Sequence, residues 1–148
     1  MAWHIVETAS SLAPDGPNEL SLYAVENYWL GQGSHLRRYT LRLDGFVSIK
    51  APWSGGECLT QLVTFAGKEL RLNFGTSAAG EIRVELQAED GSPLPGFALD
   101  DCDPIFGDAV DRPVIWKDNP DLAPHAGQPV RLRFSLRDAD LYAYRFTT

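Results

Sequence analysis

The chain has 148 residues, which is enough for one ordinary domain and too few for two comfortable ones. Hydrophobic residues make up 44% of the chain and charged residues 22%, and these proportions exclude a disordered or fibrous protein. The formal net charge of −7 disfavours nucleic acid as a partner, because nucleic-acid binding depends on clustered Lys and Arg. No apolar run is long enough to cross a membrane as a helix.

The N-terminal third contains two strand-like stretches, residues 3–6 and 19–28, separated by a segment of small and polar residues with Gly and Pro. A second break rich in glycine follows at residues 31–34. This region lacks the alternation of Arg and Leu that dominates the rest of the chain. We therefore predict an N-terminal appendage over residues 1–35 and a β-sandwich domain over residues 36–148.

Downstream, hydrophobic and polar residues alternate with a period of two, which is typical of strands that bury one face. In residues 131–137, Leu132, Phe134 and Leu136 share one face, and the arginines lie on the other. The same alternation occurs in residues 39–43, 69–74, 81–87 and 142–146. Gly, Pro and Asp residues typical of turns separate these runs, and no helical period of useful length is present. The pattern predicts an all-β fold: a two-sheet antiparallel β-sandwich of the jelly-roll or concanavalin type, with about eight to ten short strands and almost no helix.

The two cysteines, Cys58 and Cys102, do not have the spacing of a metal site or of a disulfide framework. Two buried thiols are the simpler interpretation, because Cys behaves as a small hydrophobic residue. One disulfide stays open as the alternative for an oxidising compartment. The first residues lack the basic and apolar regions of a secretory signal, so a secreted or periplasmic location would require a signal that was removed or lies upstream.

Acidic residues are concentrated between residues 90 and 121, where several aspartates follow one another closely. Ca²⁺ binds about six to eight oxygens from carboxylates and loop carbonyls, and a loop this acidic can supply several of them. The candidate calcium ligands are Asp100, Asp101, Asp103 and Asp108. Their spacing does not match an EF-hand, and the alternative is that they cap turns and solvate a long connection.

Aromatic residues in loops are candidates for sugar binding, because the C–H face of a pyranose ring stacks on Trp or Tyr while polar side chains bind the hydroxyls. The candidate sugar-binding residues are Tyr28, Trp29, Trp53, Trp116 and Glu57. Trp29 and Trp53 lie beside breaks that contain Gly or Pro, where the alternative is that they pack the appendage onto the sandwich. For Trp116 a place in the core or in an interface is an equally open interpretation.

The arginines that alternate with the hydrophobic residues of 131–137 also have two interpretations. One is cross-strand ion pairing with glutamates of neighbouring strands on a solvated sheet face. The other is a polar face that binds an acidic or neutral glycan, although the net charge argues mildly against polyanions. The residues concerned are Arg131, Arg133 and Arg137, with Arg42, Arg71, Arg83 and Arg145 as further candidates and Glu69, Glu81 and Glu85 as the expected partners.

Several stretches together resemble one known family. They are residues 37–48 (RRYTLRLDGFVS), 53–57 (WSGGE), 80–86 (GEIRVEL), 93–102 (PLPGFALDDC), 127–134 and 138–142. Over about residues 19–148 the chain resembles the C-terminal β-sandwich of bacterial glycoside hydrolase-like proteins related to the invertase-type family 32. In such proteins a five-bladed propeller carries the catalytic carboxylates and precedes the sandwich, and residues 18–23 and 26–28 resemble the end of that propeller.

The resemblance implies an accessory module, because this chain is too short to hold a propeller and lacks the nucleophile and acid motifs. We therefore expect no catalytic residue here, and keep a hydrolase only as a third alternative. The first hypothesis is a non-catalytic carbohydrate-binding module that binds a polysaccharide or oligosaccharide and is associated with a glycoside hydrolase. The second is a purely structural sandwich that packs on a catalytic propeller and has no ligand of its own. The second hypothesis predicts an apolar patch around residues 1–35 and self-association through it.

Overall fold

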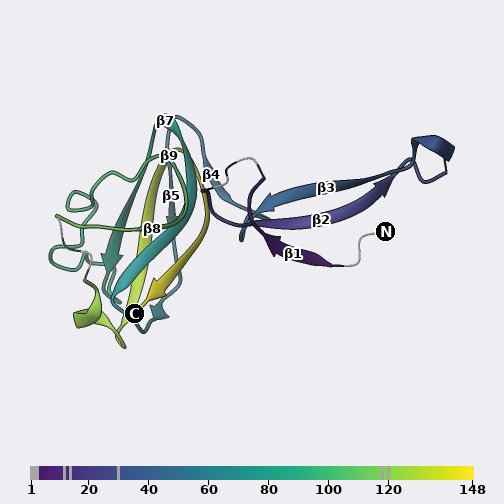
Figure 1. Cartoon of the computed structure of the whole chain (residues 1–148). Helices are drawn as coiled ribbons and strands as arrows, with labels where there is room; N and C mark the ends of the chain where they lie inside the picture. The colour runs from purple at the N-terminus through teal and green to yellow at the C-terminus, as the bar shows by residue number, and fades with distance from the viewer. Residues whose placement is uncertain (1–3, 12, 14, 30, 118, 120) are drawn as a thin grey trace. The chain divides into compact units, whose positions relative to one another are not determined.

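The computed structural model describes residues 4–11, 13, 15–29, 31–117, 119 and 121–148; Trp3, at the start of the first predicted strand, lies outside them. The described residues form antiparallel strands and two short 3₁₀ turns, with no α-helix among them (Figure 1). The chain divides into two compact units, an N-terminal unit of residues 1–46 and a C-terminal unit of residues 47–148. The all-β prediction with almost no helix is confirmed.

The N-terminal unit is a three-stranded antiparallel sheet in the order β1-β2-β3. Its strands are β1 (Ile5–Thr8), β2 (Glu19–Glu26) and β3 (His35–Arg42), and a 3₁₀ turn, η1 (Gly31–Gly33), lies between β2 and β3. β3 pairs with β2 along its whole length, from His35 opposite Glu26 to Arg42 opposite Glu19. The unit therefore ends later than the predicted boundary at residue 35, because β3 belongs to this sheet.

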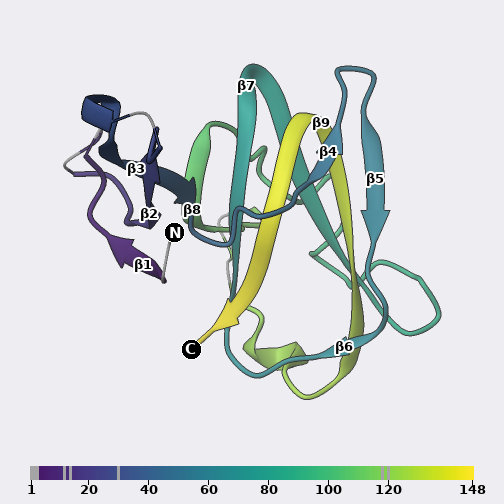
Figure 2. The ribbon, with the colours of Figure 1, turned by 90° about the vertical axis from the view of Figure 1, so that its right-hand side faces the viewer.

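The C-terminal unit contains six strands and one 3₁₀ turn within its described residues: β4 (Ile49–Ala51), β5 (Gly56–Leu59), β6 (Val63–Thr64), β7 (Glu69–Gln87), β8 (Asp108–Pro113), η2 (Ala123–His125) and β9 (Pro129–Thr147). The sheet order is β4-β9-β7-β8, and β5 and β6 also pair with β9. In Figure 2, β7 and β9 run side by side, bend together at the same end of the unit and return on the other side.

The bend gives the unit its two layers. The first half of β7 pairs with the second half of β9, beside β4 and β8. The second half of β7 pairs with the first half of β9, beside β5. The register shifts between Thr76 and Glu81, and Asp138 on β9 takes a left-handed conformation with φ of 44°. The two-sheet antiparallel β-sandwich is therefore confirmed, but the prediction of only short strands is wrong for β7 and β9, because each joins two of the predicted runs across the bend.

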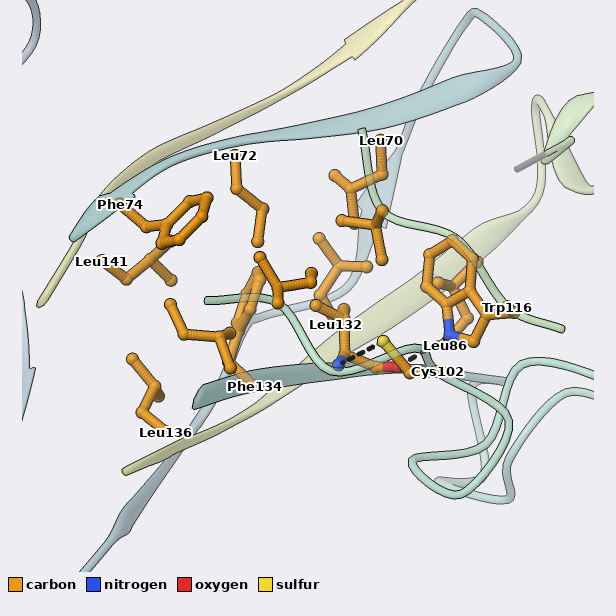
Figure 3. Close-up of a cluster of buried hydrophobic side chains, with 14 of the residues drawn as sticks. Leu70, Leu72, Phe74, Leu86, Cys102, Trp116, Leu132, Phe134, Leu136 and Leu141 are labelled. Carbon is orange, nitrogen blue, oxygen red and sulfur yellow. Dashed lines mark hydrogen bonds between the residues drawn. The ribbon is translucent and has the colours of Figure 1, made fainter. Parts of the chain in front are cut away.

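The hydrophobic core fills the space between the two layers. Leu70, Leu72 and Phe74 come from the first half of β7, and they face Leu132 and Phe134 of β9 in Figure 3. The further core residues are Ala51, Phe65, Ile82, Val84, Leu86, Phe97, Cys102, Ile105, Val114, Trp116, Leu122, Val130, Leu136, Ala139 and Leu141. All of them belong to the C-terminal unit. No helix in the described part of the chain is long and apolar enough to span a membrane.

Candidate functional site

The outer surface of one sandwich layer carries a continuous row of polar side chains, which we call the polar face. Because side chains alternate along a strand, the inward positions Leu132, Phe134 and Leu136 leave the residues between them on the outside. The residues of the polar face are Glu57 of β5, Glu81, Arg83, Glu85 and Gln87 of β7, and Arg131, Arg133, Ser135 and Arg137 of β9.

Arg133 is the centre of this face, because it pairs with a glutamate on each neighbouring strand. Its Nη2 donates to Glu57 Oε1 at 2.7 Å and its Nε donates to Glu57 Oε2 at 3.2 Å. Its Nη1 donates to Glu85 Oε1 at 3.4 Å. These charge-assisted hydrogen bonds, above all those to Glu57, raise the pKa of Arg133. Arg133 therefore links a glutamate of β5 to a glutamate of β7 across β9.

Glu85 is almost fully buried, with 4% of its surface exposed, although it lies on the outer side of the sheet. Its carboxylate also accepts hydrogen bonds from Gln87 Nε2 at 2.8 Å and from the backbone N–H of Leu99 at 3.2 Å. The loop before β8 thus covers this part of the face. These three donors, Arg133, Gln87 and Leu99, satisfy a buried charge that would otherwise be costly.

Further along the face, Arg137 pairs with Glu81 at 3.3 Å, and Arg83 lies 4.0 Å from the same carboxylate. Arg83 Nη1 also donates to the carbonyl of Cys102 at 3.1 Å. In the other layer, Arg71 pairs with Glu69 at 2.8 Å (Nη1–Oε2). The predicted cross-strand ion pairing is therefore confirmed for Glu81 and Glu85, whereas Glu69 pairs with Arg71 of its own strand, β7.

Trp53 lies at one end of the polar face, in the turn between β4 and β5, and 58% of its surface is exposed. The carbonyl of Pro52 accepts hydrogen bonds from Gly55 N–H at 2.9 Å and from Asp138 N–H at 3.0 Å, which ties this turn to β9. The guanidinium carbon of Arg137 lies 5.1 Å from the centroid of the indole, a cation–π distance. Two of the predicted sugar-binding residues, Trp53 and Glu57, are thus placed on the same side of one layer.

Tyr28 and Trp29 belong to the N-terminal unit, in the connection that follows β2. They are strongly exposed, at 67% and 89%, and form an edge-to-face pair with ring centroids 5.1 Å apart. They make an aromatic pair of their own within that unit.

Trp116 was included among the sugar-binding candidates, and this prediction is wrong. Only 1% of its surface is exposed, and its Nε1–H donates to the carbonyl of Val84 at 2.7 Å inside the core (Figure 3). Phe97 packs edge-to-face against it, with ring centroids 5.3 Å apart. A ring enclosed on all sides cannot offer a face to a sugar, so Trp116 belongs to the core.

Of the aspartates proposed as calcium ligands, Asp100, Asp101 and Asp103 lie in the connection before β8, and Asp108 is the first residue of β8. Asp101 accepts a hydrogen bond from the backbone N–H of Ala98 at 3.3 Å and pairs with Lys117, whose ammonium lowers the pKa of the carboxyl group. Asp100, Asp103 and Asp108 are exposed. Among the described residues, no group of three or more His, Cys, Asp or Glu side chains is placed to hold a metal ion.

The two cysteines are free thiols. Cys102 is buried, its Sγ accepts a hydrogen bond from the N–H of Val84 at 3.3 Å, and desolvation raises its pKa to about 11. Cys58 is half-buried on β5 and lines an apolar groove of about 450 Å³ together with Phe134, Leu141 and Tyr144.

The described part of the N-terminal unit differs from the C-terminal unit in its burial. None of its described hydrophobic residues is buried, in contrast to the core of the C-terminal unit. The strand pairing places Ile5, Tyr39 and Leu41 on one face of the sheet. Exposed apolar side chains also occupy the opposite face, namely Val6, Tyr23, Val25 and Leu36.

We compared the chain with protein-family models, curated proteins and solved structures, and none of them matches it.

Proposed function

We propose that this chain is a non-catalytic carbohydrate-binding module that binds a polysaccharide or oligosaccharide through the polar face and Trp53. The observation that carries the proposal is the exposed indole of Trp53 at the end of a row of charged hydrogen-bonding side chains on one sheet layer. An association with a glycoside hydrolase follows from the family resemblance described above.

The arrangement suits a sugar because it combines one apolar platform with fixed polar groups. The indole offers a flat surface for the C–H groups of a pyranose ring. Arg137, beside it, donates hydrogen bonds, and the carboxylate of Glu57 accepts them from hydroxyl groups. These two side chains are already held by ion pairs, so little conformational freedom is lost when a ligand binds.

The same ion pairs argue against glycoside hydrolysis at this face. Hydrolysis needs one protonated carboxylic acid and one carboxylate about 5–10 Å apart. Arg133 pairs with both Glu57 and Glu85, so the same guanidinium engages both carboxylates and neither is set apart as the acid of such a pair.

The test is retention of the chain on insoluble polysaccharides, together with a glycan array run with and without a chelator. Trp53→Ala should weaken binding about tenfold or more, because the stacking platform is lost. Phe106→Ala is the matched control, since Phe106 is as exposed, at 59%, but lies outside the polar face. The proposal would be overturned if the chain bound no glycan, or if Trp53→Ala and Phe106→Ala bound glycans equally well.

A second candidate function, docking onto another protein domain, is favoured by the N-terminal unit. A sheet with exposed apolar residues on both faces and no buried hydrophobic residue in its described part leaves its apolar area without a partner. We propose a β-sheet of a neighbouring domain, such as a catalytic propeller, as the structure that covers it. A β-sheet partner can pack on a face and pair with an edge strand.

This second proposal predicts self-association of the chain when its partner is absent. Sedimentation should show oligomers at high concentration, and a double variant Val25→Thr, Leu36→Thr should reduce them. Val47→Thr is the control, because Val47 is 78% exposed but belongs to the C-terminal unit. A strictly monomeric chain that binds no hydrophobic dye would contradict docking through this sheet.

A further inference from the structure

Arg131 lies at the end of the polar face opposite to Trp53, and it has no partner within the described residues. Its Nε is buried and makes no hydrogen bond. The other three arginines of the polar face, Arg83, Arg133 and Arg137, each pair with a glutamate. Arg131 is therefore the exception on a face where charges are otherwise matched.

Neighbouring side chains are engaged elsewhere and leave this donor unsatisfied. Gln87 is directly opposite Arg131 in the pairing of β7 with β9, but its amide group donates to Glu85. The Oε1 of Glu85 already accepts from Gln87 and Arg133, and its Oε2 accepts from Leu99. A buried N–H of a charged group without an acceptor is costly, and such groups in native proteins usually have a bound partner.

An oxyanion is the group that fits Arg131 best. A guanidinium is always charged, and its Nε and Nη donors form a planar fork that matches a carboxylate or sulfate. Within the polar face itself, four arginines accompany three glutamates, so one guanidinium is left without a glutamate partner on the face.

We infer that Arg131 is an oxyanion subsite, and that the glycan bound by the polar face carries carboxylate or sulfate groups. The inference rests on the proposed function and narrows its substrate class. Arg131 and Arg137 are separated by six positions on one strand, or about 20 Å. A ligand that contacts both Arg131 and Trp53 is therefore an oligosaccharide of several rings rather than a single sugar.

The first experiment observes the Nε–H group of Arg131 directly, by its ¹H–¹⁵N NMR signal, assigned from the signal lost in Arg131→Lys. Glucuronate and glucose 6-sulfate test the two sources of an oxyanion, and glucose is the neutral control. We expect a saturable shift with at least one of the anionic sugars and none with glucose. An unchanged signal with both anionic sugars would mean that neither oxyanion binds at Arg131 and would overturn the inference.

The second experiment compares the affinities of the chain for two oligosaccharides of equal length. One is neutral, and the other carries the anionic group that shifts the Arg131 signal in the first experiment. The unaltered chain should bind the acidic one about tenfold or more tightly, since a charge-assisted hydrogen bond forms only with the anion. Arg131→Gln should remove this preference, and Arg131→Lys should lose most of it because the planar fork is absent. Arg145→Gln is the matched control: Arg145 lies on the same strand but pairs with Asp111 in the other layer.

The outcomes separate this inference from the proposed function. If both oligosaccharides bind equally well and Arg131→Gln changes nothing, carbohydrate binding stands and the oxyanion subsite is wrong. If neither oligosaccharide binds, the proposed function fails and the inference fails with it. Loss of the preference in Arg131→Gln, with the preference retained in Arg145→Gln, supports both.

Discussion

The bend shared by β7 and β9 decides how the two layers form, and Gly80 is the residue at which it can be tested. A Cβ atom at Gly80 would lie 2.4 Å from the carbonyl oxygen of Asp138 and 2.8 Å from that of Arg137. Both atoms belong to the backbone, so no flexible side chain can move aside. Gly80→Ala should therefore force the two strands apart at the bend.

The size of the effect follows from these contacts. Carbon and oxygen atoms in close contact normally stay about 3.3–3.6 Å apart, so the methyl group would overlap by nearly 1 Å. Forced overpacking of this kind costs about 1–3 kcal/mol. Gly75 on the same strand is the matched control, because its Cβ would meet no atom within 4 Å. Gly75→Ala should stabilise by about 0.4–1 kcal/mol through the lower entropy of the unfolded chain.

Urea denaturation followed by circular dichroism measures both variants. Gly80→Ala should be less stable than Gly75→Ala by about 1.5–4 kcal/mol, a large share of the stability of a domain this size. It should also weaken any glycan binding that depends on Trp53, because the displaced carbonyl belongs to Arg137, whose guanidinium lies against the indole. Equal stability of the two variants would refute the close approach of β7 and β9 at the bend.

Three further predictions concern the core and the polar face. Trp116→Phe removes the donor to the carbonyl of Val84 and should cost about 1–3 kcal/mol in denaturant unfolding; no loss would place the indole outside the core. Burial raises the pKa of Cys102 to about 11 in the folded chain, so between pH 9 and pH 11 the thiol ionises mainly in the unfolded chain. The free energy of unfolding should therefore fall by up to about 3 kcal/mol over this pH range, and it should fall less in Cys102→Ala, which lacks the thiol. Glu57→Gln should change stability by less than about 1 kcal/mol, since its pair with Arg133 is solvent-exposed, and a larger loss in the same denaturation assay would show that the pair is structural.

The alternation of hydrophobic and polar residues is the part of the sequence that predicts the fold well. Leu132, Phe134 and Leu136 are all buried, as the period of two requires, and the residues between them are outside. The pattern identifies which side of a strand is inward. It cannot identify where a strand ends, because Gly80 and Asp138 look like turn residues yet lie within β7 and β9. Their conformations serve a bend rather than a hairpin.

The polar face was harder to predict because its members are far apart in the sequence. Glu57 and Arg133 are separated by 76 residues and meet only through the pairing of β5 with β9. Trp116 is ambiguous for a related reason: apolar Ile115 precedes it and charged Lys117 follows it, and its burial depends on the distant β7 and on Phe97. The aspartates before β8 show the opposite error, since a dense local cluster in sequence spreads out once the chain folds.

The net charge of −7 illustrates why a global property cannot assign a ligand. The acidic residues that dominate the balance lie mainly between residues 90 and 121, and the polar face draws only on other parts of the chain. On that face the arginines outnumber the glutamates, and Arg131, for which the described part of the chain supplies no partner, is half-buried. An average negative charge weakens long-range attraction of a polyanion but leaves a desolvated guanidinium free to bind one oxyanion at short range. The composition therefore argues against a nucleic acid, whose many phosphates need many cations, while it is compatible with a glycan that carries few charges.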